Sequence, residues 1–162
     1  MNLAYAVVRI RSSRKKNRKI RDTLDMLRLN KVNHCTIVPE NPQYEGMLNK
    51  VKDIVTWGEI DIDTLVDILE NRVDIENDEL IEMIKDQTSY ERIDEFAIAV
   101  TSDKISLDEI DGLENFFRMH PPLGGYRGVK KPYNTGGSLG YRGEDINSLL
   151  QNMLAHKIDQ EV

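Results

Sequence analysis

The sequence predicts an α+β fold: a small sheet with two helices, then a mostly helical acidic segment and a basic, glycine-rich arm. Three observations predict this order. Strand-like and helix-like stretches alternate through residues 1–60, helical periodicity fills the acidic stretch that follows, and seven of the ten glycines lie between Gly124 and Gly143. We expect four parts: a core at 1–60, an extension at 61–117, the arm at 118–143, and a terminal amphipathic helix and tail at 144–162.

The first sixty residues read as strand, helix, strand, helix, strand. The apolar, partly β-branched run Leu3–Ile10 is typical of a strand, as are His34–Val38 and Val55–Ile60. Apolar residues at helical spacing predict helices over 17–29 and 40–55 between these strands. Two helices on one face of a small sheet would bury a modest core.

Local signals mark several positions more closely. Asn41 can cap the second helix, with Pro42 at its first position. Trp57 is expected to pack in the core or at its edge.

The acidic segment shows further helical periodicity. Asn77 is a candidate helix cap, and Ser106 with Glu109 forms the pattern of a capping box. The stretch 93–101 is interpreted as a helix, although alternating apolar positions within it would also suit a strand. Apolar residues in 146–154 predict the last amphipathic helix.

Charge is segregated along the chain, although the formal net charge is only -6. Residues 1–31 carry ten Lys or Arg against two acids, residues 32–117 carry six against twenty-two, and residues 118–143 carry five against none. An acidic middle between two basic blocks indicates an electrostatic partner on one reserved face.

The first basic block surrounds the expected start of a helix. Cations there oppose the positive end of the helix dipole, whereas the unpaired N–H groups of a helix start suit a phosphate. One alternative is a solvated basic turn, but a second block free of acids favours a polyanionic partner.

The second block combines glycines, tyrosines and cations. Glycine allows close backbone approach, tyrosine can stack on bases, and Arg and Lys can meet phosphates. Such a segment buries little apolar surface, so we expect it to order against its partner. The alternative is a flexible linker, which would not need regularly spaced tyrosines. The composition suits structured RNA better than a DNA groove.

Catalysis, metal and cofactor binding are not expected. His34, Cys35 and His120 could suggest a Cys–His nucleophile, but no orienting third group is evident, and Cys35 alternates within a strand like a buried residue. The stretch Gly136–Gly140 lacks the full spacing of a dinucleotide loop, and the acids in 59–95 show no calcium-loop pattern. A single cysteine excludes an internal disulfide and indicates a reducing compartment, and no apolar run is long enough for a membrane span.

Two stretches carry a family resemblance. "TLDMLRLNKVNHCTIVPENPQYEGMLNKVKDIVTWGEI" and "FFRMHPPLGGYRGVKKPYNTGGSLGYRGEDINSLL" resemble the large-subunit ribosomal protein family numbered thirty in bacteria and archaea and seven in eukaryotes, in its longer archaeal form. The resemblance implies a three-stranded antiparallel sheet with two helices (βαβαβ, ferredoxin-like) plus an extension. It also implies a structural role without catalysis in the cytoplasmic ribosome.

The implied partners are large-subunit (23S) ribosomal RNA, with 5S ribosomal RNA nearby, and neighbouring ribosomal proteins; neither DNA nor a membrane is expected. The alternative is a free-standing RNA-binding regulator. The basic composition and the resemblance together predict these RNA-binding residues: Arg9, Arg11, Ser12, Arg14, Lys15, Lys16, Arg18, Lys19, Arg118, His120, Tyr126, Arg127, Lys130, Lys131, Tyr133, Tyr141 and Arg142.

Overall fold

The computed structural model describes residues 3–12, 17–73 and 75–161, with side chains up to Leu154. Helices and strands mix along the chain, which confirms the α+β class. In these residues no helix is both long and apolar enough to cross a bilayer. The elements are β1 (Ala4–Arg9), α1 (Arg18–Met26), β2 (His34–Pro39), α2 (Pro42–Lys50), β3 (Val55–Glu59), α3 (Ile62–Asn71), α4 (Asn77–Gln87), α5 (Ile93–Thr101), the 3-10 turn Leu107–Glu109, β4 (Phe117–Arg118), the 3-10 turn Tyr133–Thr135, β5 (Gly140–Tyr141), the 3-10 turn Gly143–Asp145 and α6 (Ile146–Glu161).

The described strands form one five-stranded sheet in the order β4-β2-β1-β3-β5. β1 lies in the centre and pairs antiparallel with β2 and β3, so Val7 lies opposite both Thr36 and Trp57. β4 extends one edge antiparallel to β2, and β5 extends the other edge parallel to β3. The three-stranded sheet implied by the resemblance is therefore wrong at its edges. Both added strands have two residues, too few for an alternating pattern to be visible in the sequence.

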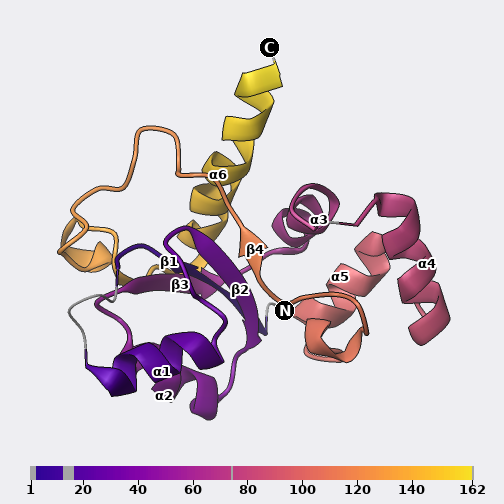
Figure 1. Cartoon of the computed structure of the whole chain (residues 1–162), viewed down its shortest axis with the longest axis horizontal. Helices are drawn as coiled ribbons and strands as arrows, with labels where there is room; N and C mark the ends of the chain where they lie inside the picture. Colours follow the sequence, from indigo (N-terminus) through magenta and orange to yellow (C-terminus); the bar gives the residue numbers. More distant parts are fainter. Residues whose placement is uncertain (1–2, 13–16, 74, 162) are drawn as a thin grey trace.

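Helices cover both faces of the sheet (Figure 1). Tyr5 and Val7 of β1 face one way, into an apolar cluster with residues of α1 and α2. The alternate residues Ala6 and Val8 face the other way, into a larger cluster with residues of α3, α4, α5 and α6. Trp57 is buried in the first cluster, as predicted. Since both faces are covered, a large partner can reach the protein only at the sheet's edges, loops and outer helices.

The two early helices begin as predicted but are shorter. Asn17 caps α1 by accepting a hydrogen bond from Ile20 N. The helix stops before Arg28, whose φ of 61° is left-handed and breaks the helical path. Asn41 caps α2, with Pro42 in its first turn, which confirms that signal. α2 ends at Lys50, and turns lead from there into β3.

The acidic segment is largely helical. α5 confirms the helix expected over 93–101, and the capping box of Ser106 and Glu109 is present at the 3-10 turn that follows. The cap expected at Asn77 is wrong. Glu76 occupies the N-cap position without a side-chain hydrogen bond, and Asn77 is the first helical residue of α4. The terminal helix is confirmed as α6.

Candidate nucleic-acid interface

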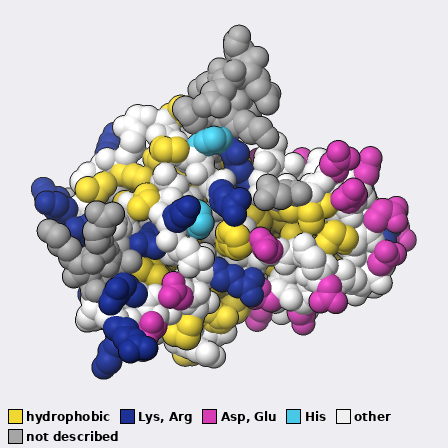
Figure 2. All heavy atoms as spheres, viewed as in Figure 1, with side chains coloured by type: hydrophobic (Ala, Val, Ile, Leu, Met, Phe, Trp, Pro, Cys, Tyr) yellow, Lys and Arg dark blue, Asp and Glu magenta, His cyan; other side chains and the backbone are white. Residues whose placement is uncertain are grey.

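Positive and negative side chains occupy opposite ends of the molecule. In Figure 2, Lys and Arg gather on the left, over the arm and α1, whereas Asp and Glu dominate the lobe of α3, α4 and α5 on the right. Charges separated in this way attract a polyanion to one end and repel it from the other. The candidate interface is therefore the end that carries the start of α1 and the arm.

Arg9, a predicted RNA contact, is turned into the protein. Only 6% of the residue is exposed. Its Nε donates to the carbonyl of Arg11 at 2.9 Å, and its Nη1 donates to the carbonyl of Leu29 at 2.7 Å. Burial lowers the pKa of the Arg9 guanidinium. Arg9 thus links the end of β1 to the segment before β2. Its charge can act on a partner electrostatically, but not through direct contact.

The neighbouring cations are more accessible. Arg11 is half-buried, with its Nη1 at 3.5 Å from the carbonyl of Asp53, and Ser12 is exposed. Lys19 is exposed at the start of α1. Arg18 is exposed as well, and its side chain lies 3.7 Å from Asp22, an exposed pair that contributes little to stability. The three other predicted contacts in this turn lie outside the described residues: Arg14, Lys15 and Lys16.

α1 favours an anion at its start for a reason of its own. Its first turn contains no acidic residue, so no carboxylate in that turn offsets the positive end of the helix dipole. Arg18 and Lys19 add two full positive charges at the same place. This local charge is what the sequence pattern predicted for the first basic block.

A second group of cations surrounds β4. Arg118 is exposed, with its guanidinium carbon 5.7 Å from the centre of the Phe116 ring, and His120 is half-buried. His34, at the start of the neighbouring strand β2, stacks against the ring of Phe116, with ring centres 5.7 Å apart. Burial, together with the charges of Arg118, Lys31 and Arg9, lowers the pKa of His34. The imidazole therefore stays neutral near pH 7.

The arm has a compact backbone. Ser138 N and Leu139 N both donate to the carbonyl of Lys131, and Tyr133 N donates to the carbonyl of Leu139 at 2.7 Å. Ser138 Oγ donates to the carbonyl of Arg127. Gly137 is required for this path, because a Cβ there would lie 2.1 Å from the Lys131 carbonyl oxygen. The bends of the arm thus depend on close backbone contacts that only glycine allows.

The arm's turns expose three cations. Arg127, Lys130 and Lys131 are all exposed, and the segment from 118 to 143 holds no carboxylate. Exposed Arg and Lys side chains are able to meet phosphates, and contact of this part of the chain with phosphate stays a prediction.

The arm's three tyrosines differ in accessibility. Tyr126 is half-buried against the larger core cluster and donates to Asn33 Oδ1 at 2.6 Å, so little of its ring is open to a base. Tyr133 is also half-buried and donates to Asp145 Oδ2 at 2.6 Å. Tyr141 is 51% exposed. Its hydrogen bond to Glu59 and its burial raise its pKa to about 12. Of the three, Tyr141 is the most open to stacking.

Arg142 has a structural position. Its Nε donates to Thr56 Oγ1 at 2.8 Å, and its Nη2 donates to the carbonyl of Ser138 at 2.7 Å. The guanidinium carbon lies 4.6 Å from the centre of the Tyr133 ring. Burial lowers its pKa, although it stays protonated. Arg142 therefore holds the arm against β3, with few donors left for a phosphate.

The residues considered for nucleophilic chemistry are poorly suited to it. Cys35 is completely buried, and burial raises the pKa of its thiol to about 12. A thiol is a weak nucleophile compared with a thiolate. Among the described residues, no group of three or more His, Cys, Asp or Glu side chains is arranged to hold a metal ion.

Sequence reasoning missed two positions that shape this interface. Lys31 is exposed and adds to the positive charge around His34. Gly58 lets the arm return to β3, because a Cβ there would lie 1.8 Å from the carbonyl oxygen of Gly143. Lys31 sits alone in a loop, and the partner of Gly58 is 85 positions away, so neither gave a local signal.

Comparison with known proteins gives one consistent result. The family model described as ribosomal protein L30p/L7e matches residues 5–55. Over 151 residues the chain is 46% identical to the large ribosomal subunit protein uL30 of Methanocella arvoryzae, covering 92% of this chain and 99% of that protein. It is 45% identical to the uL30 of Methanoculleus marisnigri over 151 residues, which is 92% of this chain and 99% of that protein. It is also 45% identical to the uL30 of Methanopyrus kandleri over 141 residues, which is 85% of this chain and 95% of that protein.

Proposed function

The chain belongs to the ribosomal protein L30p/L7e family, and from this premise we propose how it binds RNA in the ribosome. It is a structural constituent of the large subunit in the cytoplasmic ribosome, and it is not an enzyme. It binds ribosomal RNA and neighbouring ribosomal proteins. The proposal concerns which of its surfaces do so and which RNA they meet.

The RNA-binding surface comprises the start of α1 and the arm. One observation carries this proposal: Arg127, Lys130 and Lys131 are exposed on the arm, a segment without carboxylates that lies on the opposite side of the molecule from α3, α4 and α5 (Figure 1). Phosphate contacts from such cations position a protein on RNA without reading sequence. Arg11, Ser12, Arg18, Lys19, Arg118, His120 and Tyr141 complete the described surface.

Two predicted contacts take a different role within this proposal. Arg9 and Arg142 hold β1 and the arm in place by hydrogen bonds to the protein's own oxygen atoms. Tyr126 and Tyr133 likewise anchor the arm through their hydroxyl groups. These four residues shape the surface that the exposed cations present.

The RNA is the 23S ribosomal RNA of the large subunit, with 5S ribosomal RNA nearby, as the family resemblance implies. Ribosomal protein neighbours would meet the acidic end, because basic protein surfaces suit it electrostatically and RNA does not. The division of the chain at residues 60, 117 and 143 stays a prediction.

Sedimentation tests the proposal. Native lysate is run on a density gradient, before and after a wash at moderate salt, and the protein is expected to travel with large subunits in both runs. If it runs free even at low salt, the proposal is wrong. The free-standing RNA regulator would then be favoured, and sequencing the RNA that remains bound would identify its target.

Charge reversal locates the surface. The double variant Arg127→Glu with Lys131→Glu should leave the large-subunit fraction, whereas the matched variant Lys85→Glu with Lys104→Glu should stay in it. All four side chains are exposed, and the control pair lies in the acidic part of the chain. Equal retention of both variants would place the RNA elsewhere.

The ordering of the arm is tested by hydrogen exchange. Most residues of the arm are exposed outside Gly137–Leu139, so its amides should on average exchange faster than those of the fully buried β1 in the free protein. They should slow on RNA binding. Strong protection throughout 124–143 without RNA would contradict the expectation that the arm orders against its partner.

A further inference from the structure

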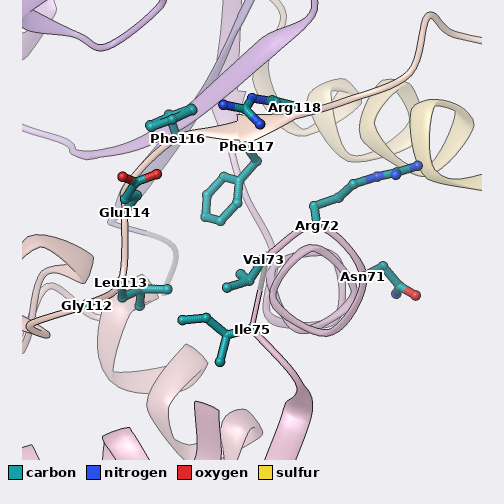
Figure 3. Close-up of a pocket in the computed structure, with 10 residues that line it drawn as sticks. All are labelled: Asn71, Arg72, Val73, Ile75, Gly112, Leu113, Glu114, Phe116, Phe117 and Arg118. Carbon is teal, nitrogen blue, oxygen red and sulfur yellow. The ribbon is translucent and has the colours of Figure 1, made fainter. Parts of the chain in front are cut away.

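A cavity of about 700 Å³ lies between the end of α3 and the segment that leads into β4. Val73 and Ile75 line it on one side, and Leu113 and Phe117 face them across it (Figure 3). Its volume is within the range of pockets that hold small organic ligands. The cavity lies outside the surface proposed above, except that Arg118 borders both.

The rim of the cavity carries aromatic and cationic groups. The guanidinium of Arg118 lies beside the ring of Phe116 on the same strand segment (Figure 3), 5.7 Å from the ring centre. Glu114 is the one carboxylate among the described lining residues, and it is exposed. The site thus combines apolar wall residues with a polar rim, on which the Arg118 guanidinium lies beside the Phe116 ring.

Arg72 also lines the cavity, but Figure 3 shows its side chain extending away from the interior toward α6. Its Nε is buried and has no hydrogen-bond partner among the described residues. Its Nη2 reaches only the carbonyl of Met153, at 3.5 Å. Burial lowers the pKa of its guanidinium. Its charge therefore faces α6, and Arg118 is the cation at the cavity rim.

The positive charges around β4 also favour an anionic ligand. Arg118, Lys31 and Arg9 act together on the neighbouring His34. Three cations acting on one imidazole mean a positive potential at this edge of the sheet. The same edge begins the acid-free segment that continues into the arm.

We propose that this cavity receives one unpaired nucleotide of RNA, with its base among Val73, Ile75 and Leu113 and its phosphate at Arg118. Bases turned out of a helix are commonly bound by apolar and aromatic side chains with a cation nearby. The proposal rests on the proposed function, because RNA bound along the segment that starts at Arg118 passes the mouth of this cavity. An acidic peptide would satisfy the cations but not this continuity.

The test uses the intact purified chain and four 5′-nucleoside monophosphates, followed by the NMR signals of the Val73, Ile75 and Leu113 methyl groups. The nucleotides are expected to shift these signals, with inorganic phosphate and free nucleosides each binding at least tenfold more weakly. The proposal is overturned if no nucleotide shifts them, or if inorganic phosphate does so equally well, which would mean an anion site only.

Three variants sharpen this test. Arg118→Gln should weaken nucleotide binding about tenfold, since it removes a charge-assisted hydrogen bond. Val73→Trp should fill the cavity and abolish the methyl shifts of Ile75 and Leu113. Arg92→Gln removes an exposed cation of the acidic part, which pairs with Asp94 and Glu95, and should change nothing. If Val73→Trp does not fold, Arg118→Gln decides, because its side chain is exposed.

Failure of the cavity and failure of the proposed function give different results. If the chain travels with large subunits while nucleotides leave its methyl signals unchanged, the cavity proposal alone is wrong. If nucleotides shift the signals while the chain sediments apart from large subunits, nucleotide binding in the cavity is supported and the proposed ribosomal function is wrong.

Discussion

Arg142 and Thr56 lie 86 residues apart in the sequence, and the Arg142 Nε donates to Thr56 Oγ1 at 2.8 Å. The backbone follows the same path, since Arg142 N donates to the carbonyl of Trp57 at 2.9 Å. The Thr56 hydroxyl in turn donates to the carbonyl of Gly140 at 2.7 Å. These bonds fasten the end of the arm to the middle of β3, so the arm's exposed cations are positioned by the sheet.

Removing this attachment should loosen the arm. Arg142→Ala loses hydrogen bonds to Thr56 and Ser138 and is expected to lower the free energy of unfolding by about 2 kcal/mol. Urea denaturation followed by fluorescence of Trp57 measures this change. Arg127→Ala is the matched control, because that side chain is exposed, and it should change stability by less than about 0.5 kcal/mol. Equal effects would mean that Arg142 does not hold the arm.

The approach of the arm to β3 should be equally sensitive to a single methyl group. Gly58→Ala places a Cβ 1.8 Å from the carbonyl oxygen of Gly143, which forces two backbone segments apart. We expect a loss of about 3 kcal/mol in the free energy of unfolding.

Gly46→Ala is the matched control for that variant. Gly46 lies within α2 and has no atom within 4 Å of the added Cβ. Alanine is the better helix former, so this variant should gain about 0.5–1 kcal/mol. A loss at both positions would indicate a general intolerance of substitution and would remove the argument from close approach.

Short-range signals explain what could be predicted from the sequence. Asn41 and Pro42 act at the start of one helix, and Ser106 pairs with Glu109 at the start of another. In each case the interacting residues lie within four positions of one another, so the sequence alone predicts their roles. The edge strands β4 and β5 could not be predicted this way. Each consists of two residues whose partners are 82 or more positions away.

The candidate site shows a similar limit. Composition identified both basic segments, because the charge of a segment is counted from its residues and does not depend on how the chain folds. It could not separate Arg9, which hydrogen-bonds inward, from Lys131, which faces solvent. That distinction depends on the Leu29 carbonyl meeting the end of β1, a tertiary contact between segments 20 residues apart.

This difference leads to a prediction on RNA binding. Lys131→Ala should weaken binding to large-subunit RNA and reduce the slope of log K against log salt concentration by about one unit, without loss of stability. Lys85→Ala, on the acidic helix α4, should leave the slope unchanged. An unchanged slope for Lys131→Ala would place that residue away from phosphate.

Arg9→Ala should behave in the opposite way. It removes two hydrogen bonds to backbone carbonyl groups, of which the one to Leu29 is buried, so we expect a loss of about 2 kcal/mol in the free energy of unfolding. Measured under conditions where the variant is folded, its salt slope should stay close to that of the parent protein. A slope reduced by a full unit with stability intact would show that Arg9 contacts phosphate directly.

His34 makes stability depend on pH. Its pKa is lowered from 6.5 in the folded protein, first by burial and then by Arg118, Lys31 and Arg9. The unfolded chain therefore binds more protons, and folding stability falls as the pH drops below about 6.5. Above that value the imidazole is neutral in both states, and its contribution is constant.

Replacing the imidazole should remove this dependence. His34→Gln is expected to be less stable overall, since the contact with Phe116 is lost, but its stability should change less between pH 7.5 and pH 5.5. Urea denaturation of both proteins at the two pH values gives the comparison. Identical pH slopes would show that His34 titrates freely in the folded protein, and that the cations around β4 do not act on it.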